Sequence, residues 1–325
     1  MGTFTVLGAT ELGELAEAFS LGAVQSSRTI AAGTINSNFE LVTDGGRYFL
    51  RINEGKAEVD VAWESRLVAA LAEQGVATPP PMLARDGRPY APLHGGGVPK
   101  WVSVFPWRDG SHLAADAITP AIATAFGAEL ATLHRVGAQL PSAWRRGSIY
   151  DHDHLVARFQ RFERLDDPLL AAAKRVLAEE IAVAGAASYI RRRATHGIIH
   201  GDLFRDNVLW QGERITAILD FEQASGGSLA YDLAVCINDW CWTGAPRFEL
   251  ARALIEGYQS VRPLTDSDRE ALPYEIRAAA MRFTITRITD VYLARVTNPD
   301  KDFRAFLARC EAWRGPSLGQ LTSTL

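Results

Sequence analysis

The sequence has 325 residues, a formal net charge of −4 and 47% hydrophobic residues. This composition excludes a disordered chain, a collagen and a short disulfide scaffold, and favours two domains. The near-neutral charge predicts a small-molecule partner rather than nucleic acid, and no apolar run is long enough to span a membrane. Three cysteines without a CxxC pair and an N-terminus without a basic leader predict a cytoplasmic protein. The sequence does not decide between a monomer and a homodimer.

The first third of the chain predicts a sheet with helices. Apolar residues at helical spacing predict a helix over 10–20. Residues 29–43 and 47–53 are rich in β-branched and aromatic residues and read as strands joined by the hairpin turn Asp44-Gly45-Gly46. A second helix is predicted over 57–74, and two further strands within 81–93 and 99–107.

Beyond residue 107 the apolar periodicity is helical, and it predicts helices over 120–135, 154–184, 248–260, 266–294 and 302–313. A short β-rich segment, residues 195–222, interrupts them with a predicted hairpin. We therefore expect an α+β fold with the two lobes of a protein kinase. Residues 1–106 would form a nucleotide-binding lobe with a five-stranded antiparallel sheet, and residues 107–325 a helical lobe that carries the catalytic loop and the substrate pocket.

The β-rich segment has the spacing of a kinase catalytic loop. It reads HGIIHGDLFRDNVLWQGERITAILDF over residues 196–221. Asp202 takes the place of the aspartate that accepts the proton of the substrate hydroxyl. Asn207 and Asp220 stand on either side of the predicted hairpin, where kinases carry the oxygen ligands of Mg²⁺. His200 is interpreted as a residue that shapes this loop, and the whole pattern predicts phosphoryl transfer from ATP.

A kinase also needs a cation on the third strand and a glutamate on the next helix. Arg51 and Glu64 hold these places, whereas Lys56 follows the strand in a predicted loop. The chain has 4 lysines and 30 arginines, and a planar arginine can grip a phosphate with two donors. No GxxxxGK[ST] motif occurs, which excludes a P-loop kinase. The predicted ATP contacts are Gly33, Ser37, Asn38, Arg51, Glu64 and Phe105.

The HGDxxxxN loop, the later Asp-Phe and the YDLA segment at 231–234 resemble the aminoglycoside phosphotransferase and choline kinase superfamily, small-molecule kinases with a protein-kinase-like fold. Within it, YDLAVCINDWCW and LPYEIRAAAMRFTITRITD are similar in order and spacing to the homoserine kinase group. This resemblance covers nearly the whole chain and implies ATP-dependent phosphorylation of the homoserine hydroxyl, in threonine biosynthesis. Glu222-Gln223-Ala224-Ser225 departs from that group, which tends to carry an aromatic residue and a cysteine there, so a changed acceptor is left open.

An amino-acid acceptor requires a cation for its carboxylate and an acid for its ammonium group. The candidates for these contacts are Asp239, Trp240, Arg282, Arg287 and Asp290, and structural ion pairs explain the charged ones equally well. The resemblance implies that Asp232 holds the catalytic loop. Phe204 stands where protein kinases often carry a lysine that contacts the γ-phosphate, and Arg205 is a candidate to replace that contact.

Other functions stay open at this point. The same transfer to another amino-alcohol or to an aminoglycoside is the nearest alternative. A nucleotide-binding pseudokinase is disfavoured because Asp202, Asn207 and Asp220 are all present. Phosphorylation of proteins has the least support, since the sequence has no APE element and no activation-loop cluster of hydroxyl residues.

Overall fold

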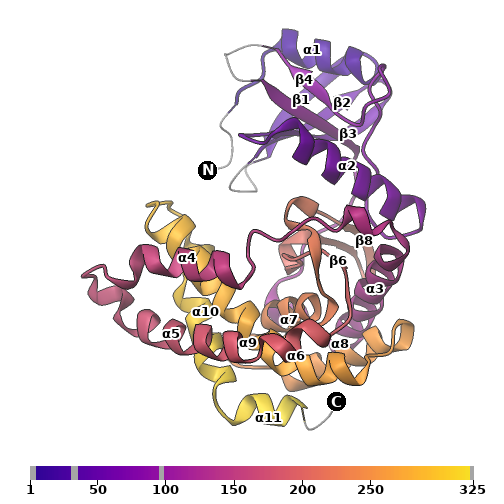
Figure 1. The fold of residues 1–325 in the computed structure, drawn as a ribbon. Coiled ribbons are helices and arrows are strands. Elements are labelled where there is room, and N and C mark those ends of the chain that lie inside the picture. Colours follow the sequence, from indigo (N-terminus) through magenta and orange to yellow (C-terminus); the bar gives the residue numbers. More distant parts are fainter. Residues whose placement is uncertain (1–4, 31–35, 95–98, 323–325) are drawn as a thin grey trace. The chain divides into compact units, whose positions relative to one another are not determined.

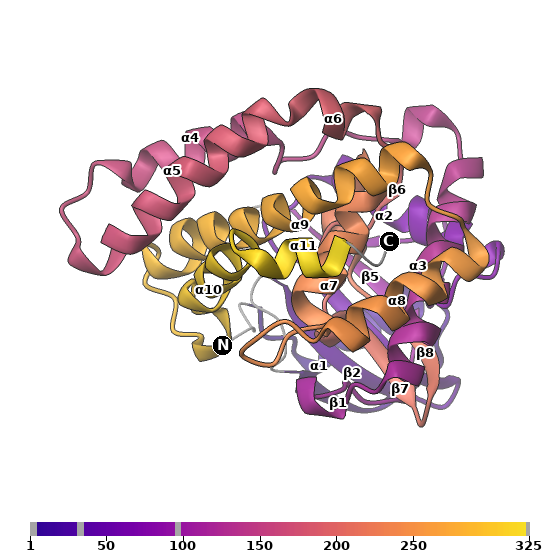
Figure 2. The ribbon, with the colours of Figure 1, turned by 90° about the horizontal axis from the view of Figure 1, so that it is seen from below.

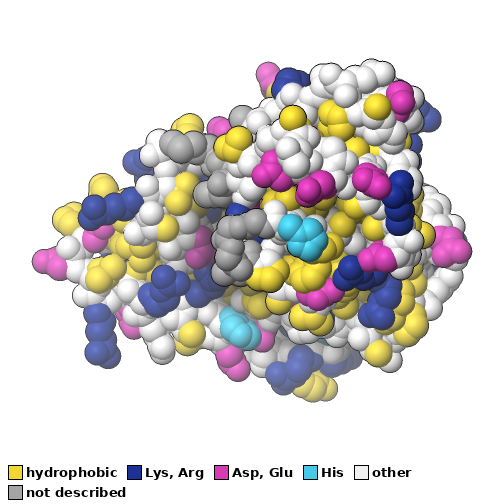
Figure 3. All heavy atoms as spheres, turned by 90° about the horizontal axis from the view of Figure 1, so that it is seen from above, with side chains coloured by type: hydrophobic (Ala, Val, Ile, Leu, Met, Phe, Trp, Pro, Cys, Tyr) yellow, Lys and Arg dark blue, Asp and Glu magenta, His cyan; other side chains and the backbone are white. Residues whose placement is uncertain are grey.

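The structure is a computed structural model that describes residues 5–30, 36–94 and 99–322. Its contacts divide the chain into two compact units (Figure 1). The first unit consists of residues 1–111, 209–211 and 216–222, and the second of residues 112–208, 212–215 and 223–325. Within the described part, no helix has both the length and the apolar character that a membrane span requires. Acidic and basic side chains are interspersed on the face seen in Figure 3.

The first unit is built on an antiparallel sheet with the strand order β1-β2-β3-β5-β4, which confirms the predicted five-stranded sheet among the described residues. The strands are β1 (Val24–Ile30), β2 (Ser37–Thr43), β3 (Gly46–Asn53), β4 (Ala91–Leu93) and β5 (Lys100–Pro106). β1 begins five residues before the predicted strand. The prediction missed this start because the first part of β1 is mostly polar and exposed, as is usual at the edge of a sheet, and shows no alternation of apolar residues.

Alternation along the strands gives the sheet one apolar face and one polar face. Leu41, Leu50 and Val104 belong to the buried cluster beneath α1 (Ala9–Ala18). The opposite face contains Arg51, and α2 (Glu58–Glu73) buries Glu64 on that side. Figure 1 shows the sheet between these two helices. The strand register thus presents the polar candidates to α2.

The second unit is mainly helical, as the sequence predicts. It contains α3 (Pro120–Gln139), α4 (His152–Glu163), α5 (Ala171–Ala186), α6 (Ser188–Arg193), α7 (Leu229–Trp240), α8 (Phe248–Val261), α9 (Asp266–Arg287), α10 (Arg304–Trp313) and α11 (Pro316–Thr322). The single helix predicted over 154–184 is wrong. Asp167 accepts a hydrogen bond from the amide of Leu169 and starts a short 3₁₀ turn at Pro168, so α4 and α5 are separate helices that lie side by side (Figure 2).

Two glycines let α3 and α8 pack with their backbones close together. A Cβ atom on Gly127 would lie 2.0 Å from the carbonyl oxygen of Leu254, and one on Gly257 would lie 2.0 Å from that of Thr124. Any side chain at either position would force the helices apart. α3, which carries His134, also packs beside the strand β6 (His196–Ile199) that leads into the predicted catalytic loop.

Candidate active site

The predicted catalytic loop, residues 200–207, follows β6 and is held by a buried carboxylate on α7. β6 pairs with β9 (Ser225–Ser228), and β7 (Val208–Gln211) and β8 (Arg214–Ile218) form the predicted hairpin after the loop. Asp232 accepts hydrogen bonds of 2.8 Å from the amides of His200 and Gly201 and of 3.0 Å from Nε2 of His134. Burial opposes the charge, but the hydrogen bond from His134, the charges of His134 and His200 and the His200 amide together hold the pKa of Asp232 below its ordinary value.

Within the loop, the side chains of His200 and Asn207 are both directed to the backbone of Asp202. The amide of Asp202 donates to Nδ1 of His200 at 3.3 Å, and Nδ2 of Asn207 donates to the carbonyl oxygen of Asp202 at 2.8 Å. This bond assigns the amide nitrogen of Asn207 to the loop, so that its Oδ1 is the atom suited to a hard cation. The side chain of Asp202 keeps 32% of its surface exposed.

Arg282 of α9, a predicted substrate contact, lies against Asp202. Its Nη1 donates to Oδ1 of Asp202 at 3.1 Å and to the carbonyl oxygen of Gly201 at 3.3 Å. Its guanidinium also covers the rings of Tyr150 and Phe283, with centroid distances of 4.1 and 3.8 Å. Arg282 is therefore a buried partner of the candidate catalytic carboxylate. Sequence reasoning missed this pair because the two residues lie 80 positions apart.

Two other predicted substrate residues also support the loop. Asp239 accepts hydrogen bonds from the amide and Nε of Arg205, at 2.9 and 3.0 Å, so the Arg205 guanidinium is engaged within the protein. Trp240 is fully buried, stacks on Phe126 and donates to the carbonyl oxygen of Leu203 at 3.1 Å. The structure therefore places Asp239 and Trp240 where they stabilise residues 203–205.

The last two predicted substrate residues lie at the end of α9. Asp290 belongs to a π-helical turn (Ile288–Tyr292), which replaces the end of the predicted helix, and Arg158 donates to it at 2.5 Å. Arg287 is half-buried, and its Nη1 donates to the carbonyl oxygen of Asp302 at 3.1 Å. Burial lowers the pKa of Arg287, in spite of several aspartates in its surroundings.

In the first unit, the predicted pair of Arg51 and Glu64 is present. Nη2 of Arg51 lies 2.8 Å from Oε1 of Glu64, and Nη1 lies 3.9 Å from Oδ1 of Asp220. Burial opposes the Arg51 charge, but the carboxylates of Glu64, Glu222 and Asp220 outweigh it, so the pKa of Arg51 is raised. Asp220 has a φ of +62°, a left-handed conformation that is uncommon outside glycine and recurs at functional positions.

Lys56 joins this cluster, although its place in a loop gave no sign of it. Its Nζ forms an ion pair with Oε2 of Glu222 and lies 3.7 Å from Oε2 of Glu64. Nδ2 of Asn36 donates to the other oxygen of Glu222 at 2.7 Å. Burial opposes ionisation of Glu222, yet Arg51 and Lys56 keep its pKa below the ordinary value. Glu222, where the sequence departs from the homoserine kinase group, thus supplies a carboxylate that neutralises Lys56.

Of the remaining predicted ATP contacts, Asn38 and Phe105 lie on the face of the sheet that contains Arg51, whereas Ser37 belongs to the opposite face. Gly33 lies outside the described residues. Ser37 is buried, donates to Glu54 at 2.7 Å and accepts a hydrogen bond of 2.9 Å from the amide of Thr5. The register places Asn38 opposite Arg51 on the neighbouring strand, and the Phe105 ring centroid lies 5.7 Å from Cζ of Arg51. The structure thus brings Asn38, Arg51, Glu64 and Phe105 together.

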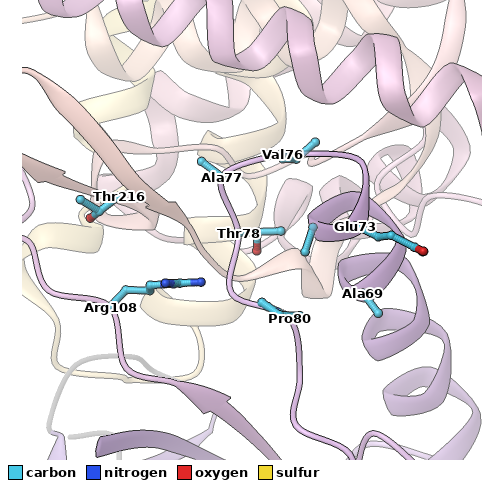
Figure 4. Close-up of a pocket in the computed structure, with 9 residues that line it drawn as sticks. Ala69, Glu73, Val76, Ala77, Thr78, Pro80, Arg108 and Thr216 are labelled. Carbon is cyan, nitrogen blue, oxygen red and sulfur yellow. The ribbon is translucent and has the colours of Figure 1, made fainter.

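A cavity of about 510 Å³ also lies in the first unit, away from the predicted site residues. The end of α2, the following segment to Pro80, Arg108 and Thr216 line it, and Figure 4 shows the Arg108 side chain extended across it. No group of three or more His, Cys, Asp or Glu side chains forms a metal cluster in the described part of the chain.

Comparison with known proteins identifies the family to which this site belongs. Residues 26–264 match the phosphotransferase enzyme family. The chain belongs to this family. The phosphotransferase is 32% identical over 324 residues to a homoserine kinase of Parvibaculum lavamentivorans, covering 97% of each chain. It is 35% identical over 296 residues to a homoserine kinase of Mesorhizobium japonicum, covering 89% of this chain and 88% of that one.

Among solved structures, the fold of the phosphotransferase is similar to that of the amicoumacin kinase hAmiN in complex with AMP-PNP, Ca²⁺ and its ligand. The TM-score is 0.74 at 16% identity, with 94% of this chain and 92% of that one covered. The predicted superfamily, the α+β kinase-like fold class and the assignment as a small-molecule phosphotransferase are confirmed by these comparisons. The roles of individual residues stay predictions.

Proposed function

We propose that this phosphotransferase transfers the γ-phosphate of ATP to the side-chain hydroxyl of homoserine, with Mg²⁺ as the cation. The observation that carries the proposal is the similarity to homoserine kinases along nearly the full length of both chains. Residues 1–106 would bind the nucleotide, and residues 107–325 would bind the acceptor.

Asp202 is the proposed acceptor of the hydroxyl proton. Its backbone is anchored by His200, Asn207 and the neighbouring amides held by Asp232, so that the carboxylate projects from a fixed loop. Arg282 holds one of its oxygens, Oδ1, and the partly exposed carboxylate keeps its second oxygen for a substrate hydroxyl. Because the transition state of phosphoryl transfer is loose, Asp202 has to hold the hydroxyl in place with an acceptor oxygen as well as to take its proton.

The residues present fit the proposed nucleotide and cation. Arg51 has a buried guanidinium held by Glu64, and its Nε has no hydrogen-bond partner among the described residues. Asn207 offers an amide oxygen and Asp220 a carboxylate that is 44% exposed, and both are hard ligands of the kind Mg²⁺ prefers. When bound, the cation neutralises charge on the phosphates. Asn207 and Asp220 are its proposed ligands.

The test is a panel of acceptors with purified protein, ATP and MgCl₂. L-Homoserine should be phosphorylated at its hydroxyl group, as seen by ³¹P NMR of the product, and Asp202→Asn should lower kcat on the order of 10³-fold while ATP still binds. Turnover of kanamycin or of an amino-alcohol in preference to homoserine would refute the proposed acceptor. An unchanged rate for Asp202→Asn would refute the role of Asp202.

A further inference from the structure

Two arginines of the second unit share one aromatic ring. Cζ of Arg287, at the end of α9, lies 4.5 Å from the ring centroid of Phe306, and Cζ of Arg309, on α10, lies 4.4 Å from the same centroid. The two guanidinium groups therefore lie no farther apart than the sum of these distances. A second ring, that of Trp242, covers Arg309 at 4.8 Å.

Both arginines use backbone oxygens as their partners. Arg287 donates to the carbonyl of Asp302 at 3.1 Å, and Arg309 donates to the carbonyls of Asn238 and Ala305 at 2.6 and 2.5 Å. Within the described part of the chain, neither arginine forms an ion pair with a carboxylate. Carbonyl oxygens satisfy donors but do not neutralise a cation.

Two neighbouring cations, one buried and one half-buried, are costly unless an anion joins them. Only 7% of the surface of Arg309 is exposed, so water contributes little to the stability of its charge. Burial lowers the pKa of Arg309, and Arg287 and Arg205 lower it further, against the opposing effect of Asp239. Burial is thus the main cost of the Arg309 charge, and no carboxylate in ion-pair contact offsets it in the described chain.

The arginine pair lies next to the catalytic loop. Phe306 stacks on Phe204, the second residue after Asp202, with centroids 5.7 Å apart and planes 7° apart. Phe283 contacts both rings, at 4.5 and 4.9 Å. Arg287 is only half-buried, so a ligand from solvent would meet the pair at Arg287.

The other arginine beside the loop is already neutralised. Arg282 forms its ion pair with Asp202 at 3.1 Å, and its guanidinium also contacts the rings of Tyr150 and Phe283. An acceptor carboxylate bound at Arg282 would compete with Asp202. In the described chain, no carboxylate is in ion-pair contact with the arginines around Phe306.

We propose that Arg287 and Arg309 bind the carboxylate of an amino-acid acceptor and that Arg309 makes the enzyme select such acceptors over amino-alcohols. This inference rests on the proposed function and adds to it the residues that recognise the α-carboxylate. Two guanidinium groups offer the planar paired donors that suit a carboxylate. Stacking on Phe306 and Trp242 holds the Arg309 donors in a fixed direction before the ligand arrives.

The first test compares two acceptors that differ by the carboxylate alone, L-homoserine and 3-amino-1-propanol. Arg309→Met and Arg287→Met should raise the KM for homoserine roughly 10- to 100-fold and leave kcat/KM for 3-amino-1-propanol unchanged. Arg304→Gln, an exposed arginine on the same helix that pairs with Asp302, is the matched control and should change neither value. An unchanged KM for homoserine in both methionine variants, or an equal loss for both acceptors, would overturn the inference.

A second test does not depend on turnover. Calorimetric titration of the full chain with L-2-aminobutyrate, which has the carboxylate but no hydroxyl group, should give at least tenfold weaker binding to Arg309→Met than to the wild type, with Arg309→Lys between them. Equal affinities, or no binding to the wild type, would overturn the carboxylate site. If Arg309-dependent binding is found but homoserine is not phosphorylated, the proposed acceptor fails and the carboxylate site stands. Arg287→Met repeats the test at a half-buried position, and ATP affinity checks folding of both variants.

Discussion

Arg51 of the first unit and Arg309 of the second are equally buried, with 7% of the surface of each exposed, yet their surroundings differ in charge. Arg51 contacts Glu64 at 2.8 Å and lies 3.9 Å from Asp220. Arg309 contacts two backbone carbonyls and two aromatic rings. Carboxylates raise the pKa of Arg51 against the effect of burial, whereas burial lowers the pKa of Arg309 to about 10.

A guanidinium group stays protonated at neutral pH in both places, so the opposite directions report how well each site stabilises the charge. The charge of Arg51 is balanced within the fold, which suits a residue that must keep its place before the nucleotide binds. The charge of Arg309 is not balanced by an ion pair in the described chain, which suits a residue whose counter-ion is the ligand. Burial alone therefore does not show whether the charge of an arginine is balanced within the fold; the carboxylates in contact with it do.

Replacement of Arg51 should have the largest effect on stability. Arg51→Met should lower the free energy of unfolding by about 4 kcal/mol, because it leaves the buried carboxylate of Glu64 without its closest partner. Urea unfolding at pH 7 measures this loss. Arg51→Lys keeps the charge but not the planar fork, and should recover part of the stability while ATP binding stays weakened. A cost below 1 kcal/mol for Arg51→Met would contradict the view that this cluster balances itself.

Asp232 of the second unit is a buried carboxylate whose charge is stabilised within the fold. Asp232→Asn should lower the free energy of unfolding by about 3 kcal/mol, because two backbone amides and His134 lose a charged acceptor. The folded state lowers the pKa of Asp232 below 3.8, so its contribution is full above that pH and is lost as the pH falls through the folded value. The difference in unfolding free energy between wild type and Asp232→Asn should therefore be constant near pH 7 and shrink below pH 3.8. A difference that grows on acidification would be inconsistent with this role.

Sequence predicted those parts of the site whose spacing is local. The predicted catalytic loop is one such part, because Asp202 and Asn207 lie only five positions apart in one short loop. Arg51 and Glu64 are another, since β3 and α2 are consecutive elements and alternation decides which face of the strand meets the helix. The sheet order follows from hairpins for the same reason.

Contacts between distant segments were beyond the reach of the sequence. Arg282 and Arg309 are both arginines on helices, and the sequence pattern around them does not show which one has a carboxylate partner. In the structure Arg282 pairs with Asp202, whereas Arg309 contacts the ring of Phe306. Lys56 was assigned to a loop correctly, but the chain distance to Glu222 hid their ion pair. In each case tertiary packing, rather than periodicity, decides which charge finds a partner.

The contrast with Arg51 predicts that Arg309 contributes little to stability. Arg309→Met removes the hydrogen bonds to Asn238 and Ala305, but it also removes a buried cation that has no carboxylate partner in the described chain. The two effects oppose each other, and we expect a loss of about 1 kcal/mol or less in urea unfolding. A loss as large as that for Arg51→Met would mean that the carbonyl bonds of Arg309 are its main purpose.

The substitution Ala305→Glu should change stability least and gives the sharpest comparison. It supplies Arg309 with a carboxylate partner, which Arg51 already has. Ala305 is exposed and precedes Arg309 by four residues on α10, so the carboxylate of Ala305→Glu can reach the guanidinium along the helix. A glutamate in this order should raise the unfolding free energy by about 0.3–0.5 kcal/mol. The same carboxylate should compete with that of the substrate and raise the KM for homoserine several-fold, while Ala305→Gln, which has the same shape without the charge, should leave it unchanged. If Ala305→Glu stabilises the protein and homoserine still binds as in the wild type, the charge of Arg309 is not the one that the substrate neutralises.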